Sequence, residues 1–246
     1  MSIFRPIASC FAAASLYPDA EGGRSRLRAI DGDDKEARRQ AILDAADLLF
    51  SERQDLANVA DVAEAAGLAK GTVYLYFQSK EELYLALHLR HVGLFFNKLI
   101  SRLDGSQPFH FSEMQSLAEQ QILNATTYLP LGACCIGFAA GAVRAEVAQH
   151  FQARLGEWLQ AAGNGLERHF PKLAPGEGVR LLKHSYAIMV GLYSLSRGEP
   201  GGDSVCPRIA GTGSFQEEAA LALMRYWAHV AGIEDTSIRN DVNSPR

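Results

Sequence analysis

The sequence predicts an all-α protein in which a small N-terminal unit of three helices precedes a larger helical body. Apolar residues recur at helical spacing along most of the chain, and the strict alternation typical of half-buried strands is absent from the sequence. Residues that commonly begin and end helices bracket these periodic segments. We therefore expect helices packed around apolar cores.

Four helices are expected in the first part of the chain, over about 35–52, 59–66, 69–77 and 80–103. Asn58 is a preferred N-cap for the second helix, and Gly67 tolerates the positive φ that often ends a helix. Ser79 and Glu82 have the spacing of a capping box, and the fourth helix that follows is apolar on nearly every side. The first helix carries one apolar stripe, formed by Ile42, Ala45, Ala46, Leu49 and Phe50.

The rest of the chain is expected to hold five helices, over about 112–128, 131–141, 145–169, 176–197 and 214–232. A Gly- and Pro-rich stretch, 197–213, predicts a long exposed loop. Residues 1–34 show no lasting period, so we expect a disordered extension or a start codon placed too far upstream. A signal peptide is less favoured, because Pro6 interrupts a short apolar run. Residues 234–246 are expected to form a polar tail.

The composition fits a globular protein: of 246 residues, 48% are hydrophobic and 21% are charged, with a formal net charge of −4. An acidic balance is the opposite of the usual basic footprint of nucleic-acid-binding proteins, so DNA contact must depend on local placement of cations. No apolar run is long enough to span a membrane. The cysteines suggest neither a disulfide framework nor a zinc site, which favours a cytoplasmic protein: Cys10, Cys134, Cys135 and Cys206.

Two short helices joined at Gly67 and preceded by a longer helix form a helix-turn-helix pattern. At about 100° per residue, Val73 and Phe77 share the inward face of the third helix. The opposite face carries Thr72, Leu75 and Tyr76, with Tyr74 at its flank. Such a face can enter a DNA major groove, while Lys70 and Lys80 anchor phosphates.

Residues 38–85 resemble the DNA-binding domain of the TetR-type (tetracycline-repressor-like) transcriptional regulators. The shared motifs are A-x-x-L-F, D-V-A-x-x-A-G-L, K-G-T-V-Y-x-Y-F and S-K-E-E-L, one for each of the four helices. The resemblance implies an all-helical homodimer with an N-terminal DNA-binding domain over 35–82 and an effector-binding and dimerisation domain over 83–233. It also implies a repressor that a small molecule releases from a near-palindromic DNA operator, without a cofactor.

The resemblance assigns DNA contacts by position. Asn58 would hold a phosphate at the start of the second helix. The remaining contacts would be Lys70, Gly71, Thr72, Tyr74, Leu75, Tyr76 and Lys80. Two positions depart from the family pattern: Gln54 stands where Gly is usual, and Ala69 replaces a Ser or Thr cap, at a cost of about 1 kcal/mol.

Charge is a difficulty for this assignment, because residues 35–82 hold six Lys or Arg against nine Asp or Glu. DNA binding would require Lys35, Arg38, Arg39, Lys70 and Lys80 to lie on one side. The alternative function is a helical protein that has lost DNA recognition and sequesters a ligand or partner. A weaker alternative is an enzyme, although no Cys, His and Asp spacing singles out a catalytic set.

Aromatic residues of the second domain are candidates for the effector pocket: Phe95, Phe96, Tyr128, Phe138, Trp158, His184, Tyr186 and Tyr193. The last two long helices are expected to dimerise as a four-helix bundle, with Tyr226 and Trp227 in the interface. His88 and His91 are expected to pack or face solvent, because no third metal ligand is apparent. Cys134 and Cys135 are read as small apolar residues, with thiol sensing as the alternative.

Overall fold

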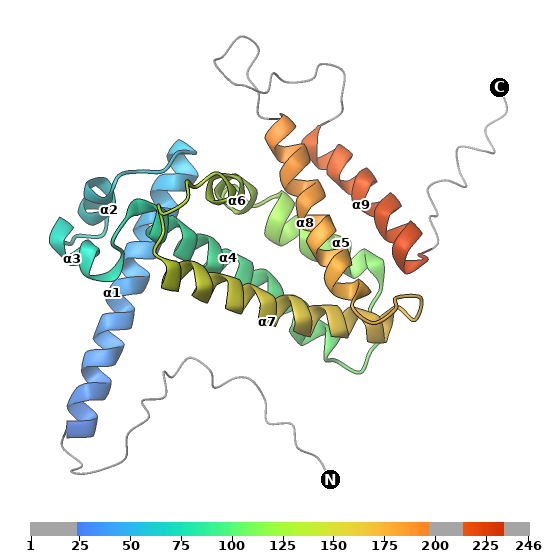
Figure 1. Cartoon of the computed structure of the whole chain (residues 1–246), viewed down its shortest axis with the longest axis horizontal. Helices are drawn as coiled ribbons and strands as arrows, with labels where there is room; N and C mark the ends of the chain where they lie inside the picture. The colour runs from blue at the N-terminus through green and yellow to red at the C-terminus, as the bar shows by residue number, and fades with distance from the viewer. Residues whose placement is uncertain (1–23, 197–213, 234–246) are drawn as a thin grey trace. The chain divides into compact units, whose positions relative to one another are not determined.

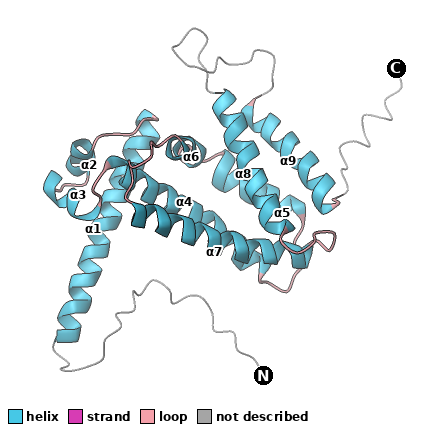
Figure 2. Cartoon of the chain, viewed as in Figure 1, coloured by secondary structure: helices cyan, strands magenta, loops and turns pink. Residues whose placement is uncertain are grey.

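The computed structural model describes residues 24–196 and 214–233, and every regular element in those ranges is a helix (Figure 2). The expected loop at 197–213, the tail at 234–246, residues 1–23, Cys10 and Cys206 lie outside the described residues. The described residues divide between Gln40 and Ala41 into two compact units. No helix among the described residues is long and apolar enough to cross a membrane.

The helices in chain order are α1 (Arg24–Arg53), α2 (Val59–Ala65), α3 (Lys70–Tyr76), α4 (Lys80–Leu103), α5 (Phe111–Ala118), a π-helix (Glu119–Leu123), α6 (Tyr128–Ile136), α7 (Ala145–His169), α8 (Glu177–Ser196) and α9 (Phe215–Ala231). The expected start of α1 at Lys35 was wrong, because the helical backbone begins at Arg24. Helix propagation needs only one further hydrogen bond per residue, so a helix can extend past a segment without apolar periodicity.

The second unit contains an N-terminal core between α1, α2, α3 and the start of α4 (Figure 1), and Leu131 of α6 is also buried in it. From Ala41 onward, α1 buries the stripe that begins at Ile42 and ends at Phe50. Val73 and Phe77 are buried against this stripe, as their spacing predicts. Removing such side chains from water stabilises the small domain by roughly 1.5–3 kcal/mol for each large residue.

The larger core lies between α4 and the helices from α5 to α9. α4 lies beside α7, and α8 lies beside α9 (Figure 1). The first half of α4 packs in the N-terminal core through Leu83 and Leu87, and its second half packs in the larger core through Phe95 and Leu99. One continuous helix therefore contributes to both cores.

Candidate DNA-binding face and ligand cavity

The orientation of α3 is fixed by the cap and turn that precede it. Asn58 Oδ1 accepts hydrogen bonds from the backbone N–H groups of Ala60 at 2.8 Å and Asp61 at 3.1 Å, which confirms the predicted N-cap of α2. Gly67 has a φ of 66° and turns the chain toward α3. Ala69 gives α3 no side-chain cap. Burial of Val73 is therefore an important contribution to the stability of this helix.

The outward face of α3 presents Leu75, whose side chain is 83% exposed. Tyr74 is 42% exposed, and Lys70 Nζ lies 5.9 Å from the centre of its ring, a cation–π geometry. Thr72 and Tyr76 are half-buried rather than fully outward, because Tyr76 also packs against the N-terminal core. An exposed leucine between a lysine and hydroxyl groups is a surface that can meet base edges and phosphates.

Ion pairs neutralise much of the acidic charge counted around the helix-turn-helix. Arg90 and Arg144 lie outside residues 35–82, so the sequence count omitted both. By contrast, Lys70 and Lys80 are exposed and form no ion pair within the described residues. The paired groups are Glu36 with Arg39, Asp61 with Arg53, Asp44 and Asp47 with Arg90, and Glu82 with Arg144.

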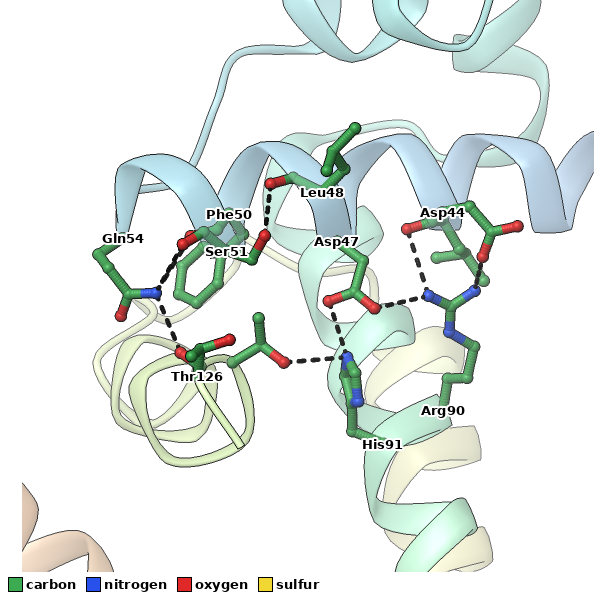
Figure 3. A network of polar contacts seen from close by, with 11 residues as sticks. Asp44, Asp47, Leu48, Phe50, Ser51, Gln54, Arg90, His91 and Thr126 are labelled. Carbon is green, nitrogen blue, oxygen red and sulfur yellow. Dashed lines mark hydrogen bonds and ion pairs between the residues drawn. The ribbon is translucent and has the colours of Figure 1, made fainter. Parts of the chain in front are cut away.

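A polar network joins α1 to α4 (Figure 3). Asp47 accepts hydrogen bonds from His91 Nε2 and Arg90 Nη2, both at 3.0 Å. Burial raises the pKa of the Asp47 carboxyl, but the hydrogen bonds and charges of His91 and Arg90 outweigh burial and leave that pKa below its ordinary value. Thr127 Oγ1 lies 3.5 Å from the same His91 nitrogen, so the network also reaches the residue before α6.

Gln54 is the one non-glycine residue with positive φ in the described chain, at 54°. This is the position where the family pattern has glycine. Its side-chain amide donates to the Thr126 carbonyl at 3.0 Å and to carbonyls at the end of α1 (Figure 3). The side chain therefore links the end of α1 to the segment that leads into α6.

A cavity of about 290 Å³ lies in the larger core. Its lining is mostly apolar and comes from α4, α5, the π-helix and α6 to α9. Four of the predicted pocket residues line it: Phe95, Phe96, Tyr128 and Tyr186. Sequence reasoning missed most of the aliphatic lining, such as Val92 and Leu159, since an apolar residue beside a cavity has the same helical spacing as one in a filled core.

The other four predicted pocket residues lie outside the cavity lining. Trp158 stacks on Phe96 with ring centres 6.2 Å apart, and Phe138 packs against the N-terminal core. His184 Nδ1 lies 2.7 Å from the Tyr226 hydroxyl on α9, and Tyr193 packs edge-on against Phe215.

Trp227 was expected at a dimer interface, but its side chain is 1% exposed inside the subunit and lines the cavity. Its Nε1 donates to Ser185 Oγ at 2.9 Å. Burial raises the pKa of the Cys135 thiol to about 12, which disfavours the reactive thiolate. No cluster of three metal-ligating side chains occurs among the described residues.

Two short helices at a fixed turn, with an exposed face on the second, define a helix-turn-helix protein. Residues 42–87 match the family model described as bacterial regulatory proteins, tetR family. The N-terminal part of this chain is therefore similar to the DNA-binding domain of TetR-type regulators.

A curated relative, the HTH-type transcriptional repressor LfrR of Mycolicibacterium smegmatis (strain ATCC 700084 / mc(2)155), is 33% identical over 93 residues. The match covers 38% of this chain and 48% of LfrR, so the chain spans about half the length of this relative.

The fold extends the likeness beyond the N-terminal domain. SmeT, the repressor of the Stenotrophomonas maltophilia multidrug efflux pump SmeDEF, matches with a TM-score of 0.51 and 18% identity over 82% of this chain and 94% of that chain. A tetR-family transcriptional regulator from Streptomyces coelicolor matches with a TM-score of 0.51 and 19% identity over 85% and 90% of the two chains. At these identities the likeness concerns the fold.

Proposed function

We propose that this protein is a transcriptional repressor that binds a near-palindromic operator as a homodimer and is released by a small-molecule effector. The observation that carries the proposal is the double role of α4. Its first turns pack in the core that orients α3, and four of its residues line the cavity: His88, Val92, Phe95 and Phe96. A ligand in the cavity can therefore act on the helix that positions the DNA-binding face.

Exposed apolar residues support the homodimer. Leu195 on α8 is 43% exposed and Leu221 on α9 is 39% exposed, on the two helices expected to form a four-helix bundle with a second subunit. Two copies of α3 would then enter successive major grooves about one DNA turn apart, or somewhat more.

Release by an effector requires that the ligand bind one subunit arrangement more tightly than the other. Tyr128 lines the cavity directly after Thr126 and Thr127, which contact Gln54 and His91. A ligand that displaces Tyr128 would therefore strain the contacts that hold α1. We propose this route, together with α4, as the coupling between cavity and operator.

The proposal is tested by selecting binding sites from random duplex DNA with the purified protein at two salt concentrations. We expect an enriched inverted repeat that is bound less tightly at the higher salt. Leu75→Ala should lower affinity for that repeat by about tenfold or more, since an apolar contact with a base is lost in both subunits. Thr72→Ala and Tyr76→Phe should also weaken binding and leave dimerisation intact.

Leu94→Ala is the matched control, because Leu94 is an exposed leucine, 52% accessible, on α4 outside the helix-turn-helix. Equal operator affinity of the Leu75 and Leu94 variants would reject the assigned face of α3. No enrichment at either salt, from folded dimeric protein, would instead favour the sequestering alternative.

A further inference from the structure

The cavity is compact and almost entirely apolar. Its volume of about 290 Å³ is just below the range of roughly 300–1,000 Å³ for small-molecule sites. The charged lining residues Glu119 and Lys183 keep contact with solvent, and Lys183 is exposed. Their charges therefore belong to the rim of the cavity rather than to its interior.

One corner of the cavity carries three polar side chains close together. His88 and Tyr128 have ring centres 5.6 Å apart, and the Tyr186 hydroxyl lies 3.2 Å from His88 Nε2. Gly132 makes room for this group, because a Cβ there would collide with the Tyr186 hydroxyl. His88 and Tyr128 are each 3% exposed.

Two polar atoms of this corner lack a protein partner. His88 Nδ1 is buried without a hydrogen bond, and the Tyr128 hydroxyl makes none within residues 24–196 and 214–233. A fully buried polar atom without a partner costs about 1–3 kcal/mol, so His88 Nδ1 favours a hydrogen-bond partner that the described protein does not supply. Ser185, the other buried polar lining residue, differs because Leu181 and Trp227 satisfy its hydroxyl.

The corner carries no charge at neutral pH. Burial, with a smaller effect from His91, lowers the pKa of His88 to about 4. Burial also raises the pKa of the Tyr128 and Tyr186 hydroxyls. A carboxylate or ammonium group placed here would lose its water without gaining an opposite charge, which is strongly unfavourable.

We infer that the effector is a compact, uncharged, apolar molecule whose single hydroxyl or carbonyl oxygen bonds to Tyr128 and His88. Either tautomer of His88 serves this oxygen. When Nε2 carries the proton and donates to Tyr186, Nδ1 accepts from a ligand hydroxyl; when Nδ1 carries it, both Nδ1 and Tyr128 donate to a ligand carbonyl. The inference rests on the proposed function, because it names the ligand class of the proposed effector site.

The test uses the full-length protein and three matched probes in isothermal titration calorimetry at pH 7. They are para-tert-butylphenol, tert-butylbenzene, which lacks the oxygen, and para-tert-butylbenzoate, which is charged. We expect the phenol to bind about tenfold more tightly than the hydrocarbon, because two hydrogen bonds are gained. The benzoate should bind more weakly than the phenol. Equal affinity for phenol and hydrocarbon, or a preference for the benzoate, would overturn the inference.

Tyr128→Phe removes the donor while keeping the ring. It should lower phenol affinity about fivefold and change hydrocarbon affinity less than twofold. Tyr84→Phe is the matched control, since Tyr84 is a buried tyrosine of the N-terminal core and does not line the cavity. A Tyr128 variant with an unchanged ratio of phenol to hydrocarbon affinity would contradict the assigned contact.

Operator binding is measured in parallel on the same preparations. Protein that binds its selected operator but shows no preference for the phenol would overturn this inference and leave the proposed function standing. Protein that prefers the phenol but binds no duplex DNA would reject the repressor function while keeping the chemistry of the cavity.

Discussion

Gln54 ends α1 in a left-handed conformation that usually belongs to glycine. An L-residue with a Cβ incurs roughly 1–2 kcal/mol in this region. The side-chain amide offsets part of this cost by hydrogen bonds to three carbonyls, including that of Thr126. The strained backbone of Gln54 is therefore partly compensated by a hydrogen bond to the segment before α6.

Two single substitutions, Gln54→Ala and Gln54→Gly, distinguish the cost of the backbone conformation at residue 54 from the contribution of the side-chain hydrogen bonds. Gln54→Ala should lower the free energy of unfolding by about 1 kcal/mol, because the hydrogen bonds are lost and the strain remains. Gln54→Gly should leave it within about 0.5 kcal/mol of the natural protein, since relief of strain compensates. Urea denaturation measures both. A glycine variant as unstable as the alanine variant would mean that the φ of 54° is not strained.

At the scale of elements, an ion pair between the buried Glu82 and the half-buried Arg144 links the start of α4 to the start of α7. The Glu82 carboxylate is 2% exposed and accepts from Arg144 Nε at 2.7 Å and Nη2 at 3.0 Å. It also accepts from the Gln78 backbone N–H at 3.1 Å, so it does not close the expected capping box with Ser79. The Ser79 half of the box is present, because Ser79 Oγ accepts from the Glu82 N–H.

This ion pair predicts a loss of stability in acid. The hydrogen bonds from Arg144 hold the pKa of Glu82 below its ordinary value of 4.5, and burial opposes them only in part. A carboxyl with a depressed folded pKa stabilises the protein above its unfolded pKa, and that contribution is lost as pH falls through the folded pKa. The difference in unfolding free energy between the natural protein and Glu82→Gln should therefore be greatest near neutral pH and shrink below about pH 4.5.

Denaturation of both proteins across this pH range gives the difference directly and cancels the acid sensitivity of other groups, such as His88. Arg144→Met should destabilise the protein more than the double variant with Glu82→Gln, because the single change leaves a buried carboxylate without its cation. A constant difference from pH 7 to pH 3 would show that the pair contributes no pH-linked stability.

At the scale of the whole molecule, the proposed DNA binding would depend on where unpaired cations lie rather than on net charge. Lys80, at the start of α4, is exposed without an ion partner among the described residues. Lys98 is also an exposed lysine of the same helix. It lies about 27 Å further along, at 1.5 Å per residue, well beyond the screening length of about 10 Å at 0.1 M salt.

Lys80→Gln should weaken operator binding for all sequences and reduce the slope of log affinity against log salt by about 2, one phosphate contact in each subunit of the dimer. Lys98→Gln should leave the slope unchanged. Fluorescence anisotropy with labelled operator at several salt concentrations measures both slopes. Matching slopes for the two variants would place the phosphate anchor elsewhere.

The sequence by itself determined the helical class, the helix-turn-helix and most helix boundaries, because caps and apolar spacing are local signals. The bounds of α4 and α7 agree with the periodicity, and Asn58 caps α2 as expected. The helix expected at 131–141 begins instead at Tyr128, since Pro130 is tolerated in a first turn. The helix expected at 112–128 ends in a π-helix at Leu123, a local irregularity without a clear periodic signal.

Only the tertiary structure decided which residues surround the cavity, which cations form ion pairs with Glu82 and Asp47, and which residues Gln54 contacts. Each of these depends on side chains that are distant in sequence, such as Glu82 and Arg144, or His88 and Tyr186. Helical periodicity distinguishes the buried face of a helix from its exposed face. It does not distinguish a buried residue in a filled core from one beside a cavity. Both kinds of residue recur at the same helical spacing, and the difference between them lies in how the other helices pack.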